Sequence, residues 1–437
     1  MNKKWRNSFF IASYIAIKLI HSDMKEVNAV IITIGDELLI GQTIDTNSAF
    51  IARELNKIGI WVKRRVAVGD VKEEIIKALN EESKENNVLI ITGGLGPTGD
   101  DITKPVLCNF FGSHLVLNEQ VLENVKNIFT RLNRPLIERN LKQAEVPDNC
   151  IVLPNLRGTA PGMWFEKDEV IFISLPGVPN EMAGLMQTSV IPKLIERLVL
   201  PVVLHKTLLV AGKGESEIAE LLTRFENNLP AHIKLAYLPA YGLVRLRLTG
   251  RSENKERLEN ELSEYFEKLV PIVKEWLVAL EDISMEESVS RLLREKHKTL
   301  STAESCTGGY IAHLITSKRG SSEIYKGSII SYAYEAKENL LGVKEKTLHE
   351  YGAVSEQTVT EMLTGVLNSL KTDYAIATSG IMGPDGGTAE KPVGTVWIAV
   401  GNKEKIKAVK YHFRFDRARN IEQTAQTSLI LLRRFIV

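Results

Sequence analysis

The stretch VLIITGGLGPT, residues 88–98, joins an apolar run that is typical of a buried parallel strand to a glycine-rich turn. Similar apolar, β-branched runs occur at residues 29–34 and 60–68, and helical patterns lie between the runs. Asp70 and Glu73 predict a capping box at the start of one of these helices. Strands that alternate with helices predict right-handed crossovers and a doubly wound α/β sheet.

The bulk composition is that of an ordinary soluble globular protein. The chain has 437 residues, of which 44% are hydrophobic and 25% charged, and this length suggests about three domains. The net charge is +1 and no basic run is interleaved with aromatic residues, so we expect no nucleic-acid partner. Three widely spaced cysteines fit a reducing compartment, and the scattered histidines predict no zinc site.

The first 23 residues precede the expected first strand. Their basic residues and the apolar run at 9–20 resemble the n- and h-regions of a signal peptide. The run is short for a bilayer span, however, and no small-residue cleavage site follows it. We expect an upstream extension or a misassigned start, with an anchor or export signal as the alternative. The protein is then expected to be cytoplasmic, with no membrane contact.

Changes of pattern divide the rest of the chain into three expected domains. Residues 24–200 form the doubly wound domain, which includes a mostly helical section at 117–153. Residues 201–280 have the pattern of a small open αβ sandwich, and residues 281–437 that of a further α/β domain.

The segment AESCTGG, residues 303–309, follows an expected strand and opens a helix. Glycine lets a ligand approach the backbone closely, and a helix N-terminus can bind an anion. Ser305 could therefore be an exposed nucleophile, although Ser305 or Thr307 could instead simply cap the helix. Cys306 is the rival nucleophile, but no histidine partner for it is evident.

Two further segments supply a base and a glycine-rich loop. Lys337 lies about one turn into a helix, and a lysine that is desolvated beside a pocket can act as a base. A strand at 374–379 leads into the loop GIMGPDGG, residues 380–387, whose N–H groups could cradle an oxyanion or a phosphate. The alternatives are a solvated lysine and a flexible surface loop. A Ser/Lys pair predicts amide or ester hydrolysis of an anionic small molecule.

These motifs resemble two known domain families. The nicotinamide-nucleotide amidohydrolase domain is similar in residues 303–309, in Tyr332 with 335–337, and in 352–355 and 383–397. The molybdopterin-binding-like domain of CinA proteins is similar in residues 35–39, 46–48, 92–98, 100–101, 175–179 and 181–182. The resemblance covers Met24 to the C-terminus. Residues 333–334 and 419–422 depart from the family pattern, which affects substrate positioning more than the reaction.

For the C-terminal domain, the resemblance implies deamidation of nicotinamide mononucleotide to nicotinic acid mononucleotide with release of ammonia. Ser305 would be the nucleophile and Lys337 its base, assisted by Tyr332, and no cofactor would be needed. The expected substrate-binding residues are Thr307, Gly308, Gly309, Ser379, Gly380, Gly383, Gly386, Gly387 and Arg417.

For the N-terminal domain, the resemblance implies a metal-dependent ADP-ribose pyrophosphatase. The expected nucleotide-binding residues are Asn47, Gly93, Gly94, Gly96 and Thr98. A divalent cation is expected on Asp36, Glu37, Asp100 and Asp101, although these acids could instead cap helices. The alternative is a domain that binds a pterin-like ligand or a protein without turnover. The resemblance also implies a homodimer.

Overall fold

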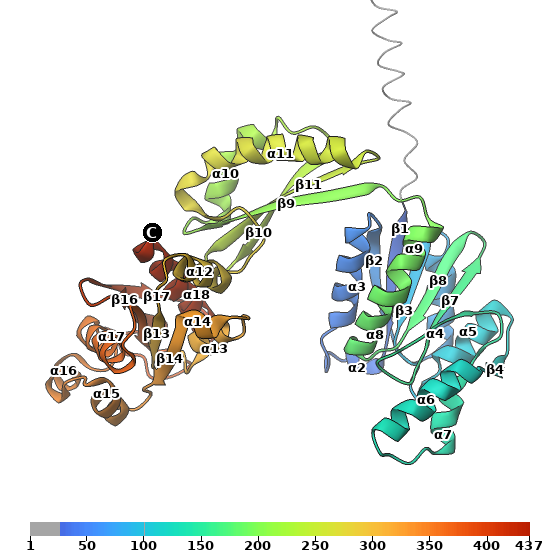
Figure 1. The fold of residues 1–437 in the computed structure, drawn as a ribbon, viewed down its shortest axis with the longest axis horizontal. Helices are drawn as coiled ribbons and strands as arrows, with labels where there is room; N and C mark the ends of the chain where they lie inside the picture. Colours follow the sequence, from blue (N-terminus) through green and yellow to red (C-terminus); the bar gives the residue numbers. More distant parts are fainter. Residues whose placement is uncertain (1–26, 100) are drawn as a thin grey trace, which may run out of the picture. The chain divides into compact units, whose positions relative to one another are not determined.

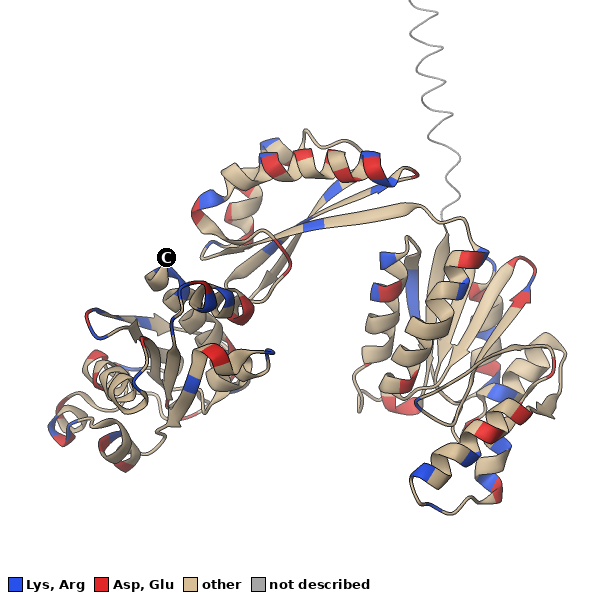
Figure 2. Cartoon of the chain, in the orientation of Figure 1, with Lys and Arg blue, Asp and Glu red and all other residues tan. Residues whose placement is uncertain are grey.

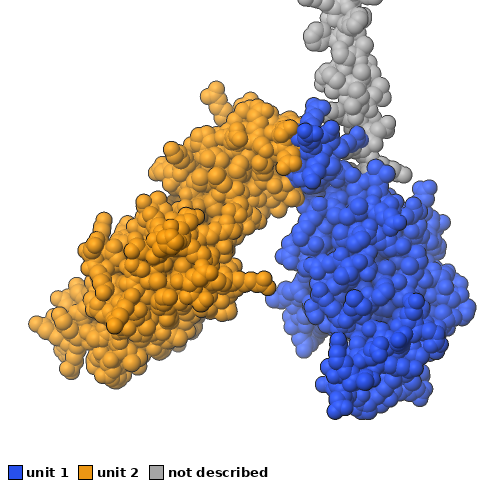
Figure 3. Space-filling view, viewed as in Figure 1, with its two compact units in different colours: residues 1–204, 251–258 blue, residues 205–250, 259–437 orange. Residues whose placement is uncertain are grey.

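The computed structural model describes residues 27–99 and 101–437. The chain divides into two compact units, the first within residues 1–204 and 251–258 and the second in residues 205–250 and 259–437 (Figure 3). Figure 2 shows acidic and basic residues interspersed along the helices of both units. No helix in the described ranges is both long enough and apolar enough to cross a membrane. The expectations for the first 23 residues lie outside the described residues.

A six-stranded sheet forms the centre of the first unit (Figure 1). Its order is β2 (Trp61–Val68), β1 (Asn28–Ile34), β3 (Val88–Thr92), β8 (Val170–Leu175), β7 (Gly162–Lys167) and β6 (Ile151–Leu153). The first four strands are parallel, β7 pairs antiparallel with β8, and β6 pairs antiparallel with β7. Every residue of β1 is buried, as its continuous apolar run predicts.

Separate hydrophobic cores lie on the two faces of this sheet. One contains Ile31 and Ile51, and the other contains Ile32 and Leu79. The first core is covered by α3 (Thr46–Lys57), α8 (Pro179–Leu185), the π-helix η2 (Met186–Val190) and α9 (Ile191–Arg197). The second is covered by α4 (Lys72–Glu82) and α5 (Thr103–Phe111). Helices on both faces of a largely parallel sheet confirm the doubly wound α/β prediction.

The section 117–153 is mostly helical, as expected: its helices are α6 (Glu119–Arg131), α7 (Glu138–Leu141) and the 3-10 turn η1 (Lys142–Ala144). Strand β4 (Leu115–Leu117) pairs with β5 (Glu145–Pro147). One local expectation for this unit is wrong. Asp70 does not cap α4. Its carboxylate instead accepts a hydrogen bond at 3.2 Å from the backbone N–H of Asp36, which follows the neighbouring strand β1.

A four-stranded sheet follows in the chain. Its order is β10 (Ile233–Ala240), β11 (Leu243–Ser252), β9 (Val202–Ala211) and β12 (Leu277–Ala279). Figure 1 shows α10 (Glu215–Glu226) and α11 (Lys255–Ile272) on one side of this sheet. The arrangement is the small αβ sandwich that the sequence predicts. A 3-10 turn, η3 (Lys274–Trp276), leads into β12.

The C-terminal part contains a five-stranded sheet. Its order is β14 (Tyr325–Ile330), β13 (Leu300–Glu304), β15 (Tyr374–Gly380), β16 (Thr395–Gly401) and β17 (Ile406–His412). The first three strands are parallel, so their carboxyl ends meet at one edge. The helices are α12 (Met285–Glu295), α13 (Tyr310–Thr316), α14 (Ser321–Ile324), α15 (Tyr334–Leu341), α16 (Glu345–Tyr351), α17 (Glu356–Leu370) and α18 (Arg417–Ile436).

One hydrophobic cluster in the second unit joins the four-stranded sheet to the C-terminal part. Leu209, Leu243 and Val278 come from the four-stranded sheet, and Ile430 and Leu432 come from α18. All five side chains are buried. The second unit is therefore packed continuously across residue 280, where the sequence places a domain boundary.

Candidate active site

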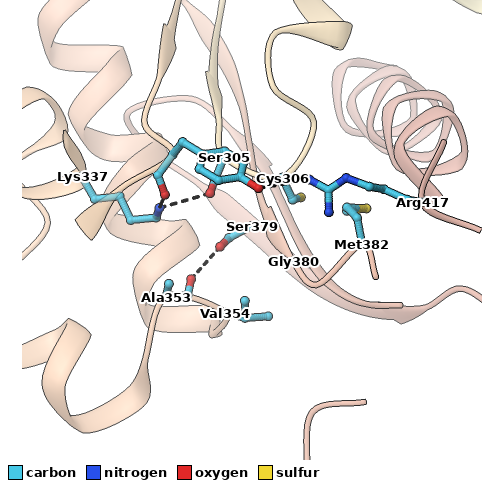
Figure 4. A pocket seen from close by; sticks show the side chains of 10 residues that line it. Ser305, Cys306, Lys337, Ala353, Val354, Ser379, Gly380, Met382 and Arg417 are labelled. Atoms are coloured by element: carbon cyan, nitrogen blue, oxygen red, sulfur yellow. Dashed lines mark hydrogen bonds between the residues drawn. The ribbon is translucent and has the colours of Figure 1, made fainter. Parts of the chain in front are cut away.

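A pocket of about 190 Å³ opens at the edge of the sheet where β13, β14 and β15 end. Figure 4 shows the side chains around it. It is lined by Ser305, Cys306, Tyr332, Lys337, Ala353, Val354, Ser379, Gly380, Met382 and Arg417. Residues that lie far apart in the sequence thus meet at one place, as parallel strands with a common carboxyl edge require.

Ser305 and Lys337 are in direct contact in this pocket (Figure 4). The Lys337 Nζ lies 3.1 Å from the Ser305 Oγ, and it also donates to the carbonyls of Ser331 at 2.8 Å and Tyr332 at 3.1 Å. The lysine is 1% exposed. Burial destabilises the ammonium ion and lowers the pKa of Lys337 below its ordinary value. The buried contact removes the alternative of a solvated surface lysine.

Cys306 is next to the nucleophile candidate, but its chemistry differs. Its side chain is buried, and burial raises the pKa of the Cys306 thiol to about 12. A thiol with such a pKa is protonated at neutral pH and is a poor nucleophile. The structure therefore favours Ser305 over Cys306.

Glu304, the last residue of β13, holds the turn that presents Ser305. Its fully buried carboxylate accepts bonds from the N–H groups of Gly309 (3.1 Å), Ile311 (3.0 Å) and Ala312 (2.9 Å). The hydroxyls of Thr307 (2.8 Å), Thr302 (3.1 Å) and Ser328 (3.4 Å) also donate to it. This role of Glu304 is not predicted from the sequence, where only its position at a strand end directly before a glycine turn sets it apart, without showing where its carboxylate points.

The same contacts change the expected role of the N-terminus of α13, the helix that follows. The sequence predicts that the first turn of α13 binds an anion of the substrate. The structure places the carboxylate of Glu304 on those N–H groups instead, so the helix N-terminus is already satisfied by the protein. Thr307, Gly308 and Gly309 are not among the residues that line the pocket.

Tyr332 and Arg417 lie together at the pocket. The Arg417 guanidinium donates to the Tyr332 hydroxyl at 3.1 Å and to the carbonyl of Gly383 at 2.8 Å. Arg417 is the first residue of α18, so the direction of this helix determines where the guanidinium lies. The Ser379 hydroxyl donates to the carbonyl of Ala353 at 2.6 Å, which connects β15 to the loop before α17.

Of the four predicted substrate-binding glycines in the loop 380–387, one lines the pocket. Gly380 lines it, whereas Gly383, Gly386 and Gly387 do not. Gly387 is closely packed: a Cβ there would lie 2.7 Å from the backbone N of Val393. Substrate binding by the three outer glycines stays a prediction.

The predicted nucleotide site of the first unit also lies at a pocket. Its volume is about 110 Å³, and Asn47, Gly93 and Glu37 are among its lining residues. The Asn47 amide donates to the Thr92 hydroxyl at 3.2 Å and to the Gly177 carbonyl at 2.7 Å. Its Oδ1 is buried and has no hydrogen-bond partner among the described residues. Gly94, Gly96 and Thr98 do not line this pocket.

The predicted metal ligands Asp36 and Asp101 accept hydrogen bonds from backbone N–H groups. The Asp101 carboxylate braces the loop, accepting bonds from the N–H groups of Gly96 and Thr98, each at 2.8 Å. Asp36 accepts a bond from the N–H of Asp70 at 3.2 Å. Within residues 27–99 and 101–437, no group of three or more His, Cys, Asp or Glu side chains could hold a metal ion. Asp100 lies outside the described residues.

Three successive parts of the chain each match a known domain family. Residues 282–436 match the CinA C-terminal domain, residues 30–196 a probable molybdopterin binding domain, and residues 205–279 the damage-inducible protein CinA KH domain. A CinA-like protein of Cytophaga hutchinsonii is 44% identical over 93% of this chain and 98% of its own length. The chain belongs to the CinA-like family.

A second curated relative and a solved structure are also similar to this chain. A CinA-like protein of Flavobacterium psychrophilum is 47% identical over 93% of this chain and 98% of its own length. A CinA superfamily protein of known structure from Klebsiella pneumoniae is 34% identical, with a TM-score of 0.34, and covers 35% of this chain and 98% of its own. The Ser305–Lys337 contact thus lies in the CinA C-terminal domain.

Proposed function

We propose that the second unit deamidates nicotinamide mononucleotide to nicotinic acid mononucleotide and ammonia by a Ser/Lys mechanism. The observation that carries the proposal is the buried contact of 3.1 Å between Lys337 Nζ and Ser305 Oγ. A lowered lysine pKa supports it, since only a neutral amine can accept the serine proton.

The reaction would proceed in two halves. Lys337 takes the hydroxyl proton as Ser305 Oγ bonds to the carboxamide carbon, and the carbonyl electron pair moves to oxygen. When this adduct collapses, the C–N bond breaks and ammonia leaves with the proton from Lys337, so that an acyl-enzyme ester remains. Water then attacks the ester, with Lys337 accepting its proton and returning it to Ser305 Oγ.

The charges around the pocket suit an anionic substrate. Lys337 and Arg417 line it, and none of the described residues that do so is acidic. With Lys337 neutral in the reactive state, Arg417 remains as the cation that can pair with a phosphate group. Arg417 and Tyr332 would bind and orient the nucleotide, while Ser305 and Lys337 carry out the chemistry.

The rate of deamidation should rise with pH through the pKa of Lys337. Protonated Lys337 cannot act as a base, and its pKa lies below the ordinary lysine value of about 10.4. A profile of kcat/KM against pH should therefore have its rising limb below that value. A limb that stays at the value of a free lysine would contradict the assignment of Lys337 as the base.

For the first unit, a second function is proposed: hydrolysis of ADP-ribose. The buried, unpartnered Oδ1 of Asn47 beside a glycine-lined pocket favours a ligand that can donate a hydrogen bond there. We derive no metal-assisted step, because the described acids do not form a cation site. Binding of a pterin-like ligand or of a protein without turnover is the alternative.

Product analysis with the purified full chain tests both functions. Nicotinamide mononucleotide and ADP-ribose are each incubated with the protein, with a divalent cation or with EDTA, and the products are separated. We expect nicotinic acid mononucleotide and ammonia under both conditions, because the serine is activated by proton transfer. Deamidation that EDTA abolishes would contradict the Ser/Lys mechanism. Binding of ADP-ribose without products would favour a non-catalytic first unit.

A further inference from the structure

The four-stranded sheet holds the helix that carries Arg417. Tyr241 lies at the turn between β10 and β11, and its hydroxyl donates to the carboxylate of Glu422 in the second turn of α18. The neighbouring Gly242 packs on the same helix, since a Cβ there would lie 3.9 Å from Ile430 Cδ1. The turn thus contacts α18 close to the end that enters the pocket.

A second attachment lies at the other end of α18. The Arg433 guanidinium donates to the carbonyl of Val278 at 2.7 Å, and the Arg434 guanidinium donates to the carbonyl of Ala211 at 3.1 Å. Both carbonyls belong to strands of the four-stranded sheet. Between the two attachments, Ile430 is buried in the cluster that the sheet and α18 share. The helix is therefore fixed at two separate points along its length.

The N-terminal end of α18 contacts the wall of the pocket and the glycine loop through two residues. Arg417 donates to the Tyr332 hydroxyl and to the Gly383 carbonyl. The Asn420 amide donates to the carbonyl of Met382, a pocket residue, at 3.1 Å. A rotation or shift of α18 would move Arg417 away from the pocket while leaving the Ser305–Lys337 contact, which is made by the turn after β13 and by α15, in place.

We propose that Tyr241 and Glu422 are positioning residues for substrate binding: their hydrogen bond sets the first turns of α18 and so the place of Arg417. The proposal rests on the proposed deamidase function. Because Arg417 binds and Lys337 reacts, loss of the Tyr241–Glu422 bond should weaken substrate binding and leave the chemical step nearly unchanged.

The test is a set of substitutions in the full chain, assayed with nicotinamide mononucleotide. Tyr241→Phe and Glu422→Ala should each raise KM by about threefold to tenfold with little change in kcat, and the double variant should be no worse than either single one. Glu422→Gln retains an acceptor for the Tyr241 hydroxyl and should restore KM. Tyr237→Phe is the matched control, because it removes a tyrosine–glutamate bond (Tyr237 to Glu226, 3.1 Å) within the four-stranded sheet and α10 alone.

A measurement that does not depend on activity separates this proposal from the deamidase itself. Hydrogen exchange of the peptide that spans residues 413–423 should be faster in Tyr241→Phe than in the parent or in Tyr237→Phe. Unchanged KM and exchange in Tyr241→Phe would overturn the positioning role, even in a fully active enzyme. A parent protein that does not deamidate the nucleotide would instead refute the proposed function, and the positioning role with it.

Discussion

Ser305→Ala and Lys337→Met are each expected to lower deamidation of nicotinamide mononucleotide by at least about a thousandfold. In the proposed mechanism the two side chains act as one unit, since the serine would be activated by transfer of its proton to the lysine 3.1 Å away. The double variant should therefore be little slower than either single variant, because losses within one catalytic unit are not additive. The measurement is kcat/KM from ammonia release by each purified variant.

Three controls accompany this experiment. Lys337→Arg retains a positive charge that cannot be deprotonated at any working pH, so it should be as inactive as Lys337→Met. Cys306→Ala should retain most activity, because the Cys306 thiol is buried and protonated. Thermal unfolding shows whether each variant is folded. Full activity in Ser305→Ala together with loss in Cys306→Ala would move the nucleophile by one residue.

Glu304→Ala is expected to lower both activity and stability. Three backbone N–H groups at the start of α13 would lose their acceptor, which should cost on the order of 3 kcal/mol of the free energy of unfolding. The turn that carries Ser305 would relax, and a displacement of about 1 Å at the nucleophile is enough for a loss of about a hundredfold in kcat. Denaturant unfolding and steady-state kinetics measure the two effects.

A conservative variant keeps this prediction testable if Glu304→Ala fails to fold. Glu304→Gln retains one oxygen acceptor, but its amide NH2 would face N–H and hydroxyl groups that now donate to the carboxylate. We therefore expect a lower kcat with a smaller loss of stability than in Glu304→Ala. Glu356→Ala removes an exposed glutamate from the first turn of α17 and is the matched control, with no change in kcat expected. Normal kcat in a folded Glu304→Gln would refute a positioning role for Glu304.

Local patterns in the sequence predict the strand ends and turns that place the site residues. Apolar, β-branched runs that end in glycine turns indicate where parallel strands stop, and parallel strands place those stops at one edge. Ser305 follows such a run, Ser379 lies at the end of one, and Lys337 lies in the helix after another, and the structure brings all three to a single pocket. The same logic predicts the doubly wound sheet of the first unit, which the structure confirms.

What the sequence does not predict depends on the direction of side chains. A glutamate before a glycine turn gives no sign that its carboxylate faces inward, because two of its six donors, Thr302 and Ser328, lie on strands rather than in the turn. Asp101 could bind a metal or cap a helix by its sequence pattern, and the bonds that its carboxylate accepts from the N–H groups of Gly96 and Thr98, which brace the loop, were not foreseen. Ser328 lies 24 residues from Glu304 in the sequence, whereas the partners of Asp101 are local and depend on the conformation of the loop.

The cluster shared by the four-stranded sheet and α18 also limits where the chain can be truncated to give a stable fragment. A fragment that begins at residue 281 would leave Ile430 and Leu432 without Leu209, Leu243 and Val278, and a bare apolar face of this kind favours aggregation. A fragment that begins at His205 retains the whole cluster. For expression, crystallisation or immobilisation of the second unit alone, the fragment should therefore begin near His205, 77 residues before the match to the CinA C-terminal domain begins at residue 282.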